Sequence, residues 1–213
     1  MNYFLKLLYQ KQRCDTIVSL LMKQEVTKMY HISDDKRAIK SAELVGQGML
    51  QCLQTTNFAD ITVTDVQKAS TVGRATFYRL FDNTADVLSY LCDGIFEQAG
   101  KAYKELNALS ADETTLAFIR IWMENKTLLK AIVDSNRMDF IFRAHMKYLT
   151  PSKEDFFKES DMDEVQTTYL MTILTACTSA VLTAWLKNGG KETAEQLQVR
   201  IKECFRTLGK IFE

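Results

Sequence analysis

One proline and eight glycines are spread over a chain of 213 residues, and this scarcity constrains the fold more than any other feature. Folds rich in strands need a turn about every ten residues, and turns consume Gly and Pro. The 46% hydrophobic and 25% charged residues are ordinary for a globular chain and exclude bulk disorder. We therefore expect an all-α protein of about nine helices.

Charge is balanced over the whole chain, with 27 basic and 27 acidic side chains. Any cationic surface for nucleic acid must therefore be local. The five cysteines are odd in number and contain no C-x-x-C pair, which argues against a zinc ribbon and a disulfide framework. We expect a reduced, cytoplasmic protein with no metal site and no cofactor.

Helix caps and apolar periodicity divide the chain into an N-terminal extension (1–32), a helix-turn-helix domain (33–83) and a helical domain (84–213). Capping boxes are expected where Thr62 precedes Asp65 and where Thr193 precedes Gln196, and Asn83 with Asp86 should cap a long helix. A linker is expected at 57–60 and an acidic loop at 150–161. Further helices are expected near 111–124, 126–133, 136–149, 163–187 and 194–211.

Residues 165–186 carry no charged side chain, and this stretch reaches the length of a membrane span. Seven Ser and Thr residues dilute its apolar character. We expect a buried helix in a soluble protein or in a dimer interface, with a membrane span as the alternative.

The most informative stretch is residues 61–88, in which a turn at 69–72 joins two short helices. Val66 and Ala69 should face inward on the first helix. On the second helix, Phe77, Leu80 and Phe81 share one face at helical spacing.

The opposite face of the second helix should be exposed and carries no acidic residue. It consists of Ala75, Tyr78 and Arg79, flanked by Arg74 and Thr76. Guanidinium, hydroxyl and small apolar groups on a short helix suit the major groove of DNA. The alternative is that Tyr78 and Arg79 form a solvated surface pair.

The sequence resembles the TetR family of bacterial transcriptional regulators over about residues 36–90. The resemblance is carried by the run Thr76-Phe77-Tyr78-Arg79-x-Phe81, with Ile61-Thr62-Val63-x-Asp65 before it and Asp86-Val87-Leu88 after it. It implies a DNA-binding domain followed by a ligand-binding and dimerisation domain. It also implies a homodimer on a palindromic operator of double-stranded DNA, most often a repressor released by a small-molecule effector.

The resemblance implies a role for each residue of the motif. Thr62 and Thr64 would contact phosphate or bases, and Tyr78 a phosphate. Arg74, Ala75 and Thr76 would approach base edges.

The sequence departs from the family pattern at three positions. Leu80 replaces a His or Tyr that commonly reaches a phosphate, and Thr84 replaces a common Lys. Thr71 occupies a turn position that usually holds Gly. Two missing phosphate contacts should weaken DNA binding and flatten its salt dependence.

The extension 1–32 carries five basic and two acidic residues, a net charge of +3. It could lie along the DNA backbone, pack as an extra helix, or form a loose tail. A start of translation at Met29 is a further alternative.

The C-terminal domain contains aromatic residues that could line an effector pocket. The candidates are Phe96, Phe118, Trp122, Phe140 and His145. The alternative for each is an ordinary core position, and His145 could be a satisfied helix histidine. Arg143 and Lys147 suggest an anionic ligand, although surface charge explains them equally well.

The last two helices are the candidates for dimerisation, since both offer an apolar surface. Enzyme motifs such as G-x-S-x-G, H-E-x-x-H and a phosphate-binding glycine loop are absent from the sequence, and we do not expect an enzyme. The alternative function is a helical dimer that acts as a coregulator through protein contacts, with little specific DNA binding.

Overall fold

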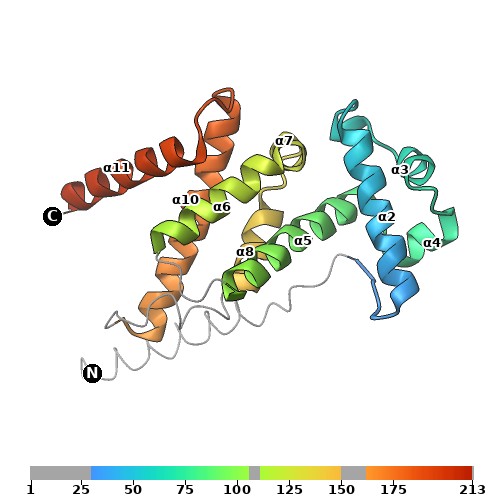
Figure 1. The fold of residues 1–213 in the computed structure, drawn as a ribbon, viewed down its shortest axis with the longest axis horizontal. Coiled ribbons are helices and arrows are strands. Elements are labelled where there is room, and N and C mark those ends of the chain that lie inside the picture. The colour runs from blue at the N-terminus through green and yellow to red at the C-terminus, as the bar shows by residue number, and fades with distance from the viewer. Residues whose placement is uncertain (1–29, 106–110, 150–161, 213) are drawn as a thin grey trace, which may run out of the picture.

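The computed structural model describes residues 30–105, 111–149 and 162–212, and every regular element in them is helical (Figure 1). The all-α class expected from the sequence is confirmed. The first half comprises α2 (Lys36–Leu53), the 3-10 turn η1 (Phe58–Asp60), α3 (Val63–Ser70), α4 (Arg74–Leu80) and α5 (Thr84–Glu105). The second half comprises α6 (Ala111–Glu124), α7 (Lys126–Asp134), α8 (Asp139–Leu149), α10 (Glu164–Lys187) and α11 (Ala194–Phe212).

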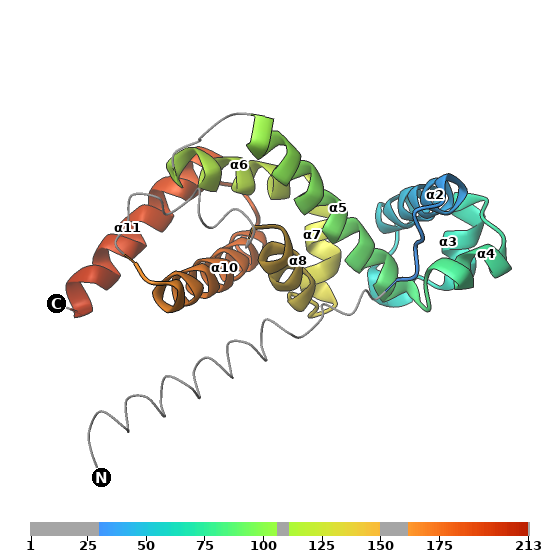
Figure 2. The same cartoon turned by 90° about the horizontal axis from the view of Figure 1, so that it is seen from below.

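Helices α2 to α4 form one end of the molecule, α10 and α11 lie toward the other, and α5 runs between them (Figures 1 and 2). One continuous apolar core extends through both parts. It includes Val45 and Phe77 in the first three helices, Leu88 in α5, and Trp122 and Ile141 beyond it. Because α5 contributes to both parts of this core, it is the structural link between them.

The predicted capping box starts α3, the second helix of the N-terminal unit formed by α2, α3 and α4. Thr62 Oγ1 accepts from the backbone N–H of Asp65 at 3.2 Å, and the Asp65 carboxylate accepts from the backbone N–H of Thr62 at 3.0 Å, so the capping box is confirmed. The expected linker at 57–60 contains the 3-10 turn η1.

The start of α5 is held by two side chains. Asn83 Oδ1 accepts from the N–H of Asp86 at 3.1 Å, and the Asp86 carboxylate accepts from the N–H of Asp82 at 2.9 Å. Asp86 is buried, and this burial raises the pKa of its carboxyl. The cap expected from Asn83 with Asp86 is confirmed.

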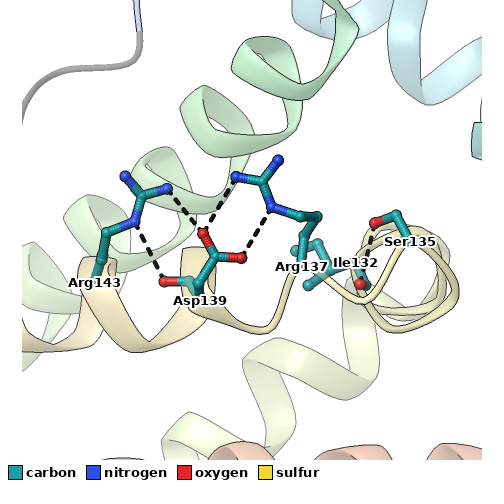
Figure 3. A network of polar contacts seen from close by, with 5 residues as sticks. All are labelled: Ile132, Ser135, Arg137, Asp139 and Arg143. Carbon is teal, nitrogen blue, oxygen red and sulfur yellow. Dashed lines mark hydrogen bonds and ion pairs between the residues drawn. The ribbon is translucent and has the colours of Figure 1, made fainter.

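The junction of α7 and α8 differs from the expectation, because α8 begins at Asp139 and not at residue 136. Asn136 has a φ of 55°, and the N–H of Arg137 donates to Ile132 O at 2.9 Å, so the chain reverses here. The Asp139 carboxylate then accepts from Arg137 Nε at 2.9 Å and from Arg143 at 3.4 Å (Figure 3). These two ion pairs of Asp139 hold the first turn of α8 in place.

Helix α10 contains the uncharged stretch and is long and apolar enough, by length and composition alone, to cross a membrane. Its Ser and Thr hydroxyls mostly donate to the carbonyl oxygen four residues earlier, as in Thr168, Thr172 and Ser179. Leu182 and Trp185 are buried, whereas Ile173 is 53% exposed. One face of α10 is therefore packed on the body of the chain and another is open to solvent, so the expectation of a buried helix or a dimer-interface helix stays a prediction for the open face.

Helix α11 packs on α6 through its first half only. The Glu195 carboxylate binds Arg120 at 2.6 Å, and this hydrogen bond lowers the pKa of Glu195. The predicted capping box of Thr193 and Gln196 starts the helix. Apolar side chains farther along α11 are exposed, and Ile211 is 67% exposed.

Candidate nucleic-acid interface

Helix α4 presents two chemically different faces, as the sequence pattern predicts. Phe77 and Leu80 are buried in the core, and Phe81, which follows the helix, is buried with them. Arg74, Ala75, Tyr78 and Arg79 are exposed on the opposite face, and Thr76 is half-buried beside them. The exposed face offers two guanidinium groups, a phenol and a methyl group.

Tyr78 and Arg74 lie against each other on this face. The Arg74 guanidinium carbon is 5.1 Å from the centre of the Tyr78 ring, and Nη2 is 3.5 Å from the phenolic oxygen. The Tyr78 ring also meets the buried Phe77 ring edge-on at 5.5 Å. Tyr78 therefore packs against a core ring while 42% of the residue stays exposed.

The turn between α3 and α4 depends on Thr71. This residue ends α3 with φ 58° and ψ 16°, in the left-handed region. A β-branched residue is strained there, since Cβ approaches the following carbonyl oxygen. The turn therefore accepts the Thr that replaces the usual Gly, at a cost in backbone strain.

The two threonines at the start of α3 are not equivalent. The Thr62 hydroxyl donates to the Asp65 carboxylate at 2.6 Å and accepts from the Asp65 N–H. Its proton is therefore not available to donate to a DNA phosphate. Thr64 is exposed, and the described residues give its hydroxyl no partner. Of these two candidates, Thr64 has the hydroxyl that is free to donate to a phosphate.

The positions that depart from the family pattern have a structural explanation. Leu80 is buried in the core under α4, so no side chain here reaches outward. Thr84 is the first residue of α5 and is half-buried. The exposed cations on α4 are consequently Arg74 and Arg79.

Sequence reasoning missed a polar link behind α4. The Tyr30 hydroxyl donates to Asp93 Oδ2 at 2.8 Å, and Lys147 Nζ donates to the same oxygen at 2.8 Å. The three residues lie in the segment before α2, in α5 and in α8. Helical periodicity gives no signal for these contacts, because Asp93 is 63 positions from Tyr30 and 54 positions from Lys147.

Four of the five candidate pocket residues gather in one cluster. The Phe96 ring lies 5.5 Å from His145 and 6.0 Å from Trp122, and the Phe118 ring lies 5.0 Å and 6.5 Å from the same two rings. Phe140 makes no ring contact with them within the part of the chain that the structure describes, and instead meets the Arg137 guanidinium at 3.9 Å.

Two polar atoms of this cluster are buried without a hydrogen-bond partner in the described residues. They are Nε1 of Trp122 and Nδ1 of His145, a residue that is only 6% exposed. Burial lowers the pKa of His145 to about 4, so the imidazole is neutral at pH 7. The nearby cations Arg143 and Lys147 are engaged by Asp139 and Asp93. The cluster is therefore apolar and uncharged, with two unused hydrogen-bonding groups.

No protein-family model matches this sequence, and no curated protein matches it. Solved structures do match its fold. A TetR transcriptional regulator from Streptococcus agalactiae 2603V is 21% identical, with a TM-score of 0.53, and the match covers 76% of this chain and 92% of that one. The chain has the TetR-regulator fold.

Two further structures extend this comparison. The dihydroxyacetone kinase operon activator DhaS is 21% identical, with a TM-score of 0.58 over 82% of this chain and 99% of that one. A protein from Syntrophomonas wolfei described as a TetR-family regulator is 15% identical, with a TM-score of 0.59 over 80% and 95%.

Proposed function

We propose that this protein is a homodimeric transcriptional regulator of the TetR type that reads double-stranded DNA with α4. The observation that carries the proposal is the exposed face of α4, which carries Arg74, Tyr78 and Arg79. The opposite face is fixed in the core by the fully buried Phe77 and Leu80. A rigid short helix with cations and no acid on its outer face fits the major groove and the phosphates beside it. Thr64 would add a phosphate contact from α3, and such a regulator would act in the cytoplasm.

Selection from random DNA duplexes tests this function. The purified full chain is incubated with the duplexes at two salt concentrations, and the bound sequences are read. We expect an enriched palindrome whose binding falls steeply with salt, since phosphate contacts release counterions. A folded dimer that enriches no sequence would contradict the proposal.

The dimer would form through α10 and α11. Apolar side chains are exposed on both helices, namely Tyr169, Ile173, Val199, Phe205, Leu208 and Ile211. The self-bonded hydroxyls of α10 allow a second helix to approach without leaving unpaired polar groups. A two-fold axis there would present two copies of α4 to two half-sites of one palindrome.

The effector would bind at the cluster of Phe96, Phe118, Trp122 and His145. An anion would be costly to bury here, because the imidazole is neutral and the neighbouring cations already have carboxylate partners. We propose a neutral, mainly hydrocarbon ligand with a hydroxyl, which can accept from Trp122 Nε1–H and bond to His145 Nδ1. Ligand packing against α5 would then change the separation of the two α4 helices.

The fluorescence of Trp122 tests this ligand class. A Trp185→Phe background removes the other tryptophan, whose Nε1–H is already engaged by Glu192 O. We expect 1-octanol to change the emission saturably, octanoate to do so far more weakly, and His145→Phe to abolish the effect of the alcohol. Equal responses to alcohol and carboxylate would contradict the ligand class.

The alternative function is a dimeric coregulator that acts through protein contacts. The buried Leu80 and the Thr at position 84 favour it, because they remove two phosphate contacts. An activator is the alternative to a repressor, since DhaS, which has a similar fold, is described as an operon activator.

A further inference from the structure

Residues 30–32 form a short strap along the end of α4. The backbone of Tyr30 makes an isolated antiparallel bridge with Phe81, and the N–H of His31 donates to Leu80 O at 2.8 Å. The N–H of Phe81 donates in turn to Phe77 O at 2.8 Å, closing the last turn of the helix. The strap therefore satisfies a backbone carbonyl that α4 leaves unpaired at its C-terminal end.

The side chain of Tyr30 anchors the strap in the core. Its ring meets the Tyr90 ring edge-on at 5.4 Å and lies 6.3 Å from the Phe81 ring. Its hydroxyl donates to Asp93 Oδ2 at 2.8 Å. Burial, with the nearby Asp93 carboxylate, raises the pKa of Tyr30, so the hydroxyl keeps the proton that it donates.

The same oxygen of Asp93 also binds α8. Lys147 Nζ donates to it at 2.8 Å, and the Asp93 side chain is only 14% exposed. Burial alone would lower the pKa of Lys147, but its hydrogen bonds to Asp93 and Tyr148 outweigh burial and raise it. One carboxylate oxygen thus joins the strap, α5 and α8.

We propose that Tyr30 and Lys147 are positioning residues that, through their shared acceptor Asp93, hold α4 in a fixed place relative to α8. The meaning of this link for DNA binding rests on the proposed function, in which α4 reads DNA. His145 lies on the same helix as Lys147. A rearrangement at the aromatic cluster that moves α8 would therefore reach the end of α4 through the hydrogen bonds of Lys147 and Tyr30 to Asp93.

A shared oxygen couples its two donors. Without Lys147, the largely buried Asp93 carboxylate loses its countercharge, and turning toward water then stabilises it. Tyr30 then loses its acceptor, and the strap is held by backbone contacts alone. Two separate carboxylates would give no such dependence.

Hydrogen exchange of the full chain, without DNA, tests the link. Lys147→Met should raise the exchange rate of the amides of Phe77, Phe81 and His31 by roughly tenfold or more, the loss expected for one hydrogen bond to a charged group. Lys147→Arg should restore protection. Lys130→Met is the matched control, since it removes an exposed ion pair with Asp134 that has no connection to Asp93.

Three results would overturn the proposal. They are wild-type exchange at residues 77–81 in Lys147→Met, a rise spread uniformly over all helices, and strictly additive effects of Tyr30→Phe and Lys147→Met. Additivity would mean that the two side chains act independently. A DNA selection that fails while these amides respond as expected contradicts the regulator function and leaves the link intact.

Discussion

Gly48 of α2 lies directly against Ser70 of α3. A Cβ atom at position 48 would lie 2.7 Å from the Ser70 backbone nitrogen and 2.8 Å from its Cβ. The contact is with backbone, so it cannot be relieved by rotating a side chain. This close approach sets the distance between α2 and α3.

We therefore expect Gly48→Ala to destabilise the protein by about 2 kcal/mol, as overpacking forces α2 and α3 apart. Urea unfolding followed by circular dichroism measures the change. Gly94→Ala in α5 is the control, because a Cβ there meets no atom within 4 Å. The control should be as stable as the wild type or about 1 kcal/mol more stable, from helix propensity. Equal destabilisation by both variants would contradict the argument.

Replacing Thr71 with Gly should stabilise the protein, because Thr71 occupies the left-handed region with φ 58°. Relief of this strain is expected to contribute about 1 kcal/mol, partly offset by the greater freedom of glycine in the unfolded chain. Thermal unfolding checks the prediction. A lower midpoint for Thr71→Gly would mean that the side chain contributes more than the backbone costs.

Arg79→Ala should weaken binding to the selected duplex and lower the salt slope by about 1, as expected for one lost phosphate contact. Thr64→Ala should weaken binding without changing stability. Thr62→Val should instead destabilise α3, because the Thr62 hydroxyl is part of its capping box. Titrations at several salt concentrations, paired with thermal unfolding, separate the two effects. Unchanged DNA affinity of Arg79→Ala would contradict the assignment of this face.

Leu208→Asp should dissociate the dimer, since it places a charge on the exposed apolar face of α11. Thr207→Asp is the matched control, because Thr207 is exposed and adjacent in the helix but outside the apolar set. Sedimentation equilibrium of both variants gives the oligomeric state. A dimeric Leu208→Asp, or a monomeric wild type, would contradict an interface at this face.

His145 should make stability depend on pH. Its folded pKa of about 4 lies below the usual histidine value of 6.5, so the unfolded chain binds more protons between these pH values and stability falls as pH falls. From pH 7.5 to pH 5 the loss is roughly 2 kcal/mol. His145→Phe should lack this part of the dependence, which urea unfolding at both pH values measures. Parallel losses in wild type and variant would contradict the prediction.

The elements of the N-terminal unit were predictable because their causes are local. The capping residues lie three positions from their partners, as Thr62 and Asp65 do, and the buried face of α4 repeats at helical spacing. The start of α8 was placed too early, because the left-handed conformation of Asn136 depends on how α7 and α8 pack. The uncharged sequence of α10 likewise left open which of its sides packs on the body of the chain, because that depends on the neighbouring helices.

By itself the sequence determined the all-α class, the caps, and which face of α4 is buried, because these follow from residues within one or two helical turns of each other. Only the tertiary structure decided that Tyr30 and Lys147 share one oxygen of Asp93, and that His145 lies among Phe96, Phe118 and Trp122. Such contacts depend on the angles and distances at which whole helices pack. Those angles and distances are set by many side-chain contacts across the core. They cannot be predicted from a short run of residues, because the contacting residues are far apart in the sequence.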